Sequence, residues 1–214
     1  RRKLMPTVPV ETPLFLVGQS LGALVGINFL LTHTVPVAGM VTLAAAIIPT
    51  VHIPEWKKRV ARRLVRVAPG MSICDGVRIE DLSRDEGERG RIAGDPLFHR
   101  RMTLQAAHEI EKNLELVMAM PHRIHVPMLM LAGSGDRVCD PEGTRQFAAR
   151  LSSTDKHYRI YPGMAHDLLH DSGSEVVLDD VEAWIGVQAA RPIHHDRQFA
   201  LNRRETLWED VSPP

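Results

Sequence analysis

The chain has 214 residues, enough to bury a sizeable core, and one domain with an insertion is the natural expectation. Its 26 basic side chains balance 26 acidic ones, so nothing in the overall charge points to nucleic acid as a partner. Cys74 and Cys139 do not make a disulfide framework, and the longest apolar stretch, residues 37–48, is shorter than the ~20 residues that cross a bilayer. We expect a protein of the cytoplasm or of the membrane periphery.

The first predicted strand, residues 14–17, is an apolar run that fits a strand buried on both faces. It leads into the motif GQSLG, residues 18–22, and a nearly all-apolar helix is predicted over 21–33. A serine between two glycines at a strand-to-helix turn is how a nucleophile such as Ser20 is presented, and we expect the sharp turn to require both glycines. A glycine-rich turn without catalytic function is the alternative. Small residues such as Gly26 let the helix approach the sheet closely.

A second buried strand is predicted over 37–48, and the alternation of strand and helix then stops. Residues 50–120 hold a basic amphipathic helix over 55–67, a stretch of mixed charge over 80–91 and a helical segment over 102–120. This composition is typical of an inserted lid rather than of a sheet layer. We call residues 50–120 the lid segment.

The basic helix of the lid segment admits two interpretations. It places one apolar stripe at helical spacing, made of Trp56, Val60, Leu64 and Val67. Six basic side chains and no acid stand in residues 57–66. The stripe packs on the body of the protein in one interpretation, and it touches an anionic membrane surface in the other.

The end of the chain returns to alternation. Strands are predicted over 126–131 and 157–161, and helices over 141–151 and 175–187. This order implies an α/β fold, a mostly parallel sheet with helices on its faces. Residues 1–49 and 121–190 would form that core, and residues 191–214 a polar tail with Trp208 as its only large anchor.

Two residues after the later strands complete a catalytic pattern with Ser20. Asp136 follows the strand 126–131 by a few residues, and His166 follows the strand 157–161. A serine hydroxyl needs a base to take its proton and an acid to orient that base. In the chain order Ser, Asp, His, Asp136 comes 116 residues after Ser20, and His166 comes 30 residues after Asp136. Taken alone, Asp136 could be a turn aspartate and His166 a surface histidine, with His170 as a competitor. Together they predict a triad.

Three blocks of the chain resemble the monoacylglycerol lipase and lysophospholipase family of serine hydrolases, which has the α/β-hydrolase fold: GDPL at 94–97, GSGDRVCD at 133–140 and YPGMAH at 161–166. The resemblance implies that Ser20 is the nucleophile, Asp136 the orienting acid and His166 the base. The N–H of Leu21 would donate to the oxyanion. Gln19 stands where the family more usually has histidine, and Cys139 could either lie near the pocket or be structural.

The implied reaction is hydrolysis of a lipid ester with one acyl chain, monoacylglycerol before lysophospholipid. A short-chain esterase or thioesterase with the same triad is one alternative, and an inactive remnant that only binds is another. No cofactor and no metal are expected. The nearest metal-like patterns are 194–196 (HHD), which we interpret as chance, and 108–112 (HEIEK), which has lysine where a zinc-protease helix has its second histidine.

The resemblance also implies that an N-terminal part is missing. No His-Gly loop precedes Ser20, although such a loop normally supplies the second oxyanion donor. Loss of one such donor typically costs about 10²- to 10³-fold in kcat, so the 214 residues alone are expected to be poorly active. The strand 14–17 would then be an exposed apolar edge.

Overall fold

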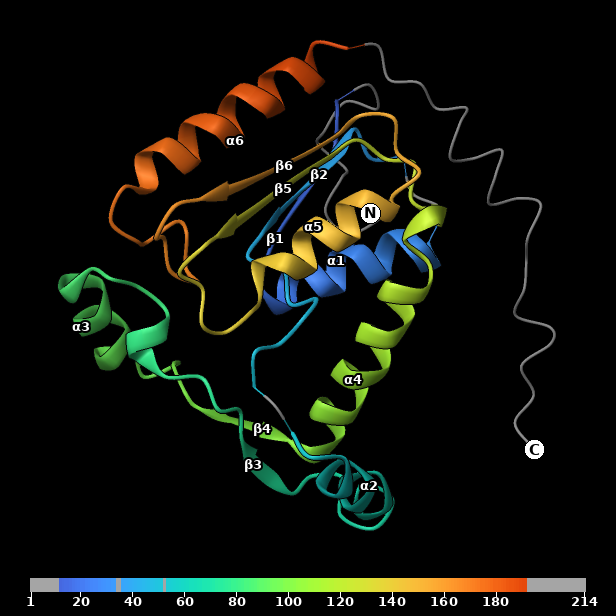
Figure 1. Ribbon diagram of the computed structural model, residues 1–214, viewed down its shortest axis with the longest axis vertical. Coiled ribbons are helices and arrows are strands. Elements are labelled where there is room, and N and C mark those ends of the chain that lie inside the picture. Colours follow the sequence, from blue (N-terminus) through green and yellow to red (C-terminus); the bar gives the residue numbers. More distant parts are fainter. Residues whose placement is uncertain (1–11, 34–35, 52, 192–214) are drawn as a thin grey trace.

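A four-stranded parallel sheet lies at the centre of the computed structural model, which describes residues 12–33, 36–51 and 53–191 (Figure 1). In sheet order the strands are β1 (Phe15–Gln19), β2 (Gly39–Leu43), β5 (Met128–Gly133) and β6 (Lys156–Tyr161). Every neighbouring pair is parallel, and Met128 pairs with Met40 on one side and with Lys156 on the other. The predicted parallel sheet is confirmed, and its strands end at one common edge.

Helices cover both faces of this sheet. α1 (Leu21–Thr32) and α5 (Pro141–Arg150) lie on one face, and α6 (Ser174–Ala189) lies on the other (Figure 1). Neighbouring residues of a strand point to opposite faces, so Met40 joins the apolar cluster with α1 and α5, whereas Val41 joins the cluster with α6. Burial on both faces explains why the central strands β2 and β5 read as apolar runs, whereas the edge strand β6 carries polar and exposed residues.

β2 ends earlier than the sequence predicts. The apolar run continues to Ile48, but the strand stops at Leu43, because Ala44 adopts a left-handed backbone with φ of 44°. The chain then turns, and the N–H of Ala46 donates to the backbone oxygen of Ser20 at 3.1 Å. The second half of the run therefore supports the turn after β1 instead of extending the sheet.

Most of the lid segment lies on the side toward which the strand arrows point, and its last helix runs back along α1 (Figure 1). Its helices are α2 (Glu55–Leu64), α3 (Glu86–Gly94) and α4 (Leu104–Ala119), with the 3-10 turn η1 (Ile79–Asp81) before α3 and the turn η2 (Pro121–Arg123) after α4. β3 (Ser72–Cys74) and β4 (Arg101–Thr103) form an antiparallel pair, which the sequence does not predict because three-residue strands show no alternation. α4 packs on α1.

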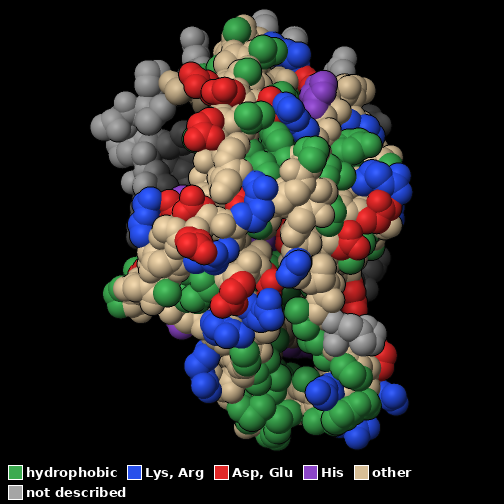
Figure 2. All heavy atoms as spheres, turned by 60° about the vertical axis from the view of Figure 1, so that its left-hand side comes forward, with side chains coloured by type: hydrophobic (Ala, Val, Ile, Leu, Met, Phe, Trp, Pro, Cys, Tyr) green, Lys and Arg blue, Asp and Glu red, His purple; other side chains and the backbone are tan. Residues whose placement is uncertain are grey.

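The apolar stripe of α2 faces solvent. Trp56 is 60% exposed and Val60 is 53% exposed. The helix meets α4 through another face, where Lys58 and Arg62 lie 3.9 and 3.3 Å from a carboxylate oxygen of Glu111. The helix therefore packs on α4, as one interpretation expects, but it leaves most of the stripe uncovered: Leu64 is half-buried, whereas Trp56, Val60 and Val67 are exposed. Figure 2 shows hydrophobic side chains gathered at the lower end of the molecule, over the lid segment, with Lys and Arg around them.

Among the described residues, none of the helices is long and apolar enough to cross a membrane. The predicted polar tail falls almost entirely on residues 192–214, which lie outside the described residues, as do residues 1–11. The division into core and lid segment stays a prediction.

Candidate active site

Ser20 occupies the turn between β1 and α1 in a backbone conformation that side-chain-bearing residues rarely adopt. Its φ is 50° and its ψ is −118°. The N–H of Ser20 donates to the oxygen of Leu43 at 2.8 Å, which fixes the turn against the neighbouring strand. Such strain persists only where the surroundings enforce it, and it is concentrated at functional sites. The sharp strand-to-helix turn predicted from the sequence is confirmed.

The two glycines of the turn differ in what they accommodate. A Cβ at Gly18 would lie 2.7 Å from the oxygen of Gly22 and 2.8 Å from the backbone of Ala23, so a larger residue is excluded. A Cβ at Gly22 would meet no atom within 4 Å. The expectation that the turn requires both glycines is therefore wrong for Gly22, because this position faces open space. Close approach at Gly26 is confirmed, since a Cβ there would lie 2.5 Å from Cε of Met40.

The structure brings together the three residues that the sequence predicts as a triad. Oγ of Ser20 and Nε2 of His166 are 2.8 Å apart, and Nδ1 of His166 and Oδ2 of Asp136 are also 2.8 Å apart. Asp136 follows β5 and His166 follows β6, so two neighbouring parallel strands deliver them to the same edge. With Nδ1 protonated, the imidazole donates to Asp136, and its Nε2 is free to accept the serine proton.

Backbone donors hold the Asp136 carboxylate in place. Its Oδ1 accepts the N–H groups of Val138 and Cys139 at 2.8 and 2.9 Å, which leaves Oδ2 for the imidazole. The side chains of Asp136 and His166 are 1% and 6% exposed, so water cannot compete well for their hydrogen bond.

Cys139 lies close to Ser20 and Asp136. Its side chain is buried, and its N–H donates to Asp136 at 2.9 Å, so this cysteine is near the site. Burial, followed by the charge of Asp136, raises the pKa of Cys139 to about 12, although a hydrogen bond with Ser20 lowers it. The thiol therefore stays neutral at physiological pH and does not compete with Ser20 as a nucleophile.

A hydrogen bond that the sequence does not predict links the turn that carries Ser20 to the loop that carries His166. Nε2 of Gln19 donates to Oδ1 of Asp167 at 2.8 Å. Gln19 directly precedes Ser20, and Asp167 directly follows His166, so this bond joins the turn to the histidine loop. The Asp167 carboxylate also binds Nδ1 of His170 at 3.0 Å, which removes His170 as a competitor for the base. The only signal in the sequence is the position of these residues beside the triad.

Leu21 begins α1, and its N–H lies at the helix N-terminus. The first N–H groups of a helix have no partner within that helix and point toward its positive end. The N-terminus of α1, directly after Ser20, therefore favours negative charge there. That the N–H of Leu21 donates to an oxyanion stays a prediction.

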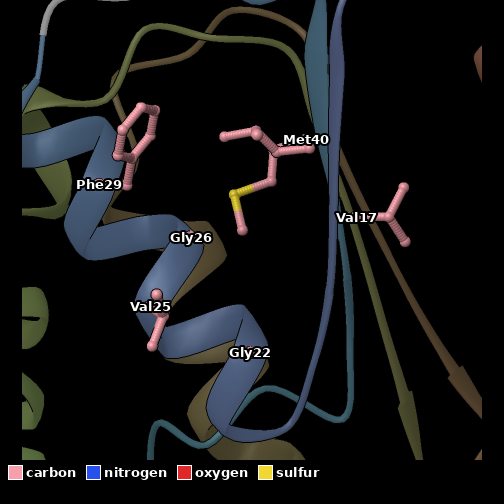
Figure 3. A pocket seen from close by; sticks show the side chains of 7 residues that line it. Val17, Gly22, Val25, Gly26, Phe29 and Met40 are labelled. Atoms are coloured by element: carbon pink, nitrogen blue, oxygen red, sulfur yellow. The ribbon is translucent and has the colours of Figure 1, made fainter. Parts of the chain in front are cut away.

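An apolar cavity of about 260 Å³ lies along the free edge of β1, away from the triad (Figure 3). It is lined by Leu16, Val17, Gly22, Val25, Gly26, Phe29 and Met40. None of these side chains carries a polar group, so the cavity offers no catalytic chemistry. Within the described residues β1 is an edge strand, and Val17 is 56% exposed there.

The described residues contain no group of three His, Cys, Asp or Glu side chains that could hold a metal ion. The pattern at 194–196 lies outside the described residues.

A parallel sheet with a serine turn after one strand, and an acid and a base after two others, defines the α/β-hydrolase class of fold. Residues 3–173 match the model of the serine aminopeptidase S33 family, Hydrolase_4, and the chain belongs to this family. The predicted resemblance to monoacylglycerol lipases is confirmed by the relatives. The chain is 30% identical to the mouse monoglyceride lipase over 194 residues, 84% of this chain and 60% of that protein.

Two further relatives carry the same name. The chain is 30% identical to the monoacylglycerol lipase of Mycolicibacterium smegmatis over 130 residues, 59% of this chain and 45% of that protein. The crystal structure of the Paleococcus ferrophilus monoacylglycerol lipase superposes with a TM-score of 0.78 at 28% identity, over 83% of this chain and 69% of that one. The chain thus spans about half the length of the curated relatives it matches.

Proposed function

We propose that this chain carries the nucleophile, base and acid of a serine hydrolase that cleaves a carboxylic ester of a single-chain lipid. The observation that supports it is the hydrogen-bonded series Ser20, His166, Asp136, with 2.8 Å at each step. Family membership supports the hydrolase class. The names of the relatives favour monoacylglycerol as the substrate, ahead of lysophospholipid.

The reaction would proceed in two steps. Nε2 of His166 takes the proton of Ser20, and Oγ attacks the acyl carbonyl to form a tetrahedral oxyanion that accepts the N–H of Leu21. As the intermediate collapses, the ester C–O bond breaks, and His166 returns the proton to the departing glycerol oxygen. Water, deprotonated in turn by His166, then attacks the acyl-enzyme and releases the fatty acid with Ser20 restored.

A fluorophosphonate probe tests the nucleophile directly, because it phosphonylates only an activated serine. We expect labelling at Ser20, loss of labelling in Ser20→Ala, and retained labelling in the control Ser72→Ala, which removes an exposed serine of β3. Asp136→Asn should slow labelling about 10³- to 10⁴-fold, because the imidazole loses its orienting acceptor. These measurements are made on the full-length protein, and a well-folded full-length wild type that stays unlabelled would favour the inactive remnant.

Substrate choice is tested separately, on protein that labels. Release of fatty acid from monoacylglycerol and lysophospholipid is compared with hydrolysis of a short-chain ester and of a thioester. We expect monoacylglycerol to be cleaved with the highest kcat/KM. A preference for the short ester or the thioester would replace the lipid assignment with one of those alternatives.

We also propose that α2 touches an anionic membrane surface, so that the lid segment meets lipid substrates where they reside. Its stripe is exposed at Trp56 and Val60 and continues to Val67, which is 79% exposed. Lysine and arginine side chains of residues 57–66 surround it, as in helices that lie in the plane of a membrane interface.

Sedimentation with vesicles tests this contact. Binding to vesicles with anionic lipid should exceed binding to neutral ones and should weaken in Val60→Ser. Val187→Ser is the matched control, because Val187 is equally exposed on α6. Equal weakening by both substitutions would contradict the role of α2.

A further inference from the structure

Asp171 is a buried carboxylate that the proposed reaction does not use. It lies five residues after His166, and its side chain has no exposed surface. Three donors satisfy it: the N–H of Ala165 at 2.7 Å, the N–H of Arg84 at 2.6 Å and Nε of Arg84 at 2.8 Å, with Oγ of Ser83 nearby at 3.4 Å. A buried charge is tolerated only with such partners.

These donors come from two segments that are far apart in the sequence. Ser83 and Arg84 belong to the lid segment, between η1 and α3, whereas Ala165 directly precedes His166. We call Ser83, Arg84 and Asp171 the lid clamp. Further hydrogen bonds join the same two segments, from Oγ of Ser83 to the oxygen of His170 at 2.8 Å and from Nη2 of Arg84 to the oxygen of Ser172 at 2.6 Å.

The lid clamp acts on the backbone that carries the base. The N–H of Ala165 donates to the same Oδ2 of Asp171 that accepts Nε of Arg84, so the arginine and the histidine loop share one oxygen. His166 must keep Nε2 within hydrogen-bond distance of Ser20 and Nδ1 within reach of Asp136. A displacement of about 1 Å in such a site can cost about 10²-fold in rate.

We infer that Asp171 is a positioning residue for His166, and that its ion pair with Arg84 couples the place of the lid segment to the place of the base. The inference rests on the proposed function, because it gives the imidazole a reaction to serve. Removal of the Asp171 charge would free the N–H of Ala165 and let the histidine loop shift away from Ser20. A lid that lifts at Arg84 would disturb the base through the same carboxylate.

The test compares Asp171→Asn and Arg84→Gln with Asp155→Asn in the full-length protein. Asp155 is a matched control, because its carboxylate also binds an arginine, Arg191, but at the opposite end of β6. Three quantities are measured: the rate of fluorophosphonate labelling at Ser20 across pH, the thermal midpoint, and the proton NMR signal of Nδ1–H of His166.

We expect Asp171→Asn to slow labelling about 10- to 100-fold and to shift or broaden the Nδ1–H signal. Arg84→Gln should do the same to a smaller extent, and Asp155→Asn should change only the thermal midpoint. Labelling that falls no more than in Asp155→Asn, with the Nδ1–H signal unmoved, would overturn the inference. A full-length wild type that is not labelled would overturn the proposed function instead, and the response of the Nδ1–H signal to Asp171→Asn would still decide the positioning role. Lack of this signal in the wild type would count against both.

Discussion

The sheet and the lid segment are held by different forces. The sheet strands, α1, α5 and α6 interlock through two clusters of buried apolar side chains, one on each face, and α4 of the lid segment joins one of them through Val117. In the lid segment, α2 and α3 have no buried residue at all. The segment from η1 to α3 is instead attached by the polar bonds of the lid clamp. Apolar burial is distributed over many residues, whereas the clamp concentrates attachment at one point.

This contrast indicates that α2 and α3 can change position independently of the sheet. Local opening is favoured where few apolar contacts oppose it, and α2 and α3 meet that condition, whereas α4 is packed on α1 and joins the apolar core. We therefore expect α2 and α3 to be able to change position while the sheet stays folded. The loop that carries His166 is the exception, because it is attached both to the sheet and to the lid segment.

The largest expected effect comes from Phe147, which is fully buried between α5 and the sheet. Phe147→Ala should lower the free energy of unfolding by about 3–5 kcal/mol, because it removes a large side chain and leaves a cavity. Trp56→Ala on α2 should change it by less than about 0.5 kcal/mol. Denaturant unfolding measures both, and equal losses would erase the contrast between sheet and lid segment.

The next effect separates the two glycines of the serine turn. Gly18→Ala should destabilise the chain by about 1–3 kcal/mol, because its methyl group meets backbone atoms that cannot move aside. Gly22→Ala should be neutral or stabilise by up to about 1 kcal/mol, since alanine favours the helix and the space is open. Thermal melting of the pair measures the difference, and a similar loss in both variants would restore the expectation that both glycines are required.

A smaller effect is the loss, at low pH, of the stability that Asp171 contributes. Burial tends to raise the pKa of Asp171, but the hydrogen bonds from Ala165 and Arg84 outweigh it and hold the pKa below its usual 3.8. Their stabilisation is therefore fully present above about pH 4 and is lost as the pH falls through the lowered value. The difference in thermal midpoint between wild type and Asp171→Asn should narrow below pH 4. A difference that stays constant from pH 7 to pH 2 would contradict this assignment.

The smallest effect is expected where α2 meets α4. Glu111→Gln removes the partner of Lys58 and Arg62, but surface ion pairs contribute only about 0–1 kcal/mol. The free energy of unfolding should fall by no more than that, and the loss should shrink further in high salt. A loss as large as that in Phe147→Ala would show that the lid segment is part of the cooperative core.

The sequence predicts best what depends on local pattern. β1, β2, β5 and α1 follow from apolar runs, β6 from alternation, α5 from the proline in its first turn and α6 from amphipathic spacing. The placement of Asp136 and His166 follows from strand ends that share one edge. The early end of β2 could not be predicted, because the left-handed backbone at Ala44 carries no residue signature. The same holds for the β3–β4 pair, which is too short to show a period.

Polar contacts between distant segments were the main omission. Gln19 with Asp167 and Arg84 with Asp171 are each separated by many residues, and neither pair forms a pattern along the chain. The direction of the α2 stripe also depends on tertiary structure. Its amphipathic spacing is clear, but only the position of α4 decides which face is covered.

The left-handed backbone of Ser20 affects the stability of variants that lack the Ser20 hydroxyl. A residue in such a conformation costs of order 1–3 kcal/mol, and glycine alone adopts it freely. Ser20→Gly would therefore relieve this backbone strain. The variant would lack the nucleophilic hydroxyl but would have a higher thermal midpoint of unfolding. Ser20→Ala retains the Cβ and therefore retains the backbone strain. At position 20, therefore, the residue that the proposed reaction needs is not the residue that has the lowest backbone energy.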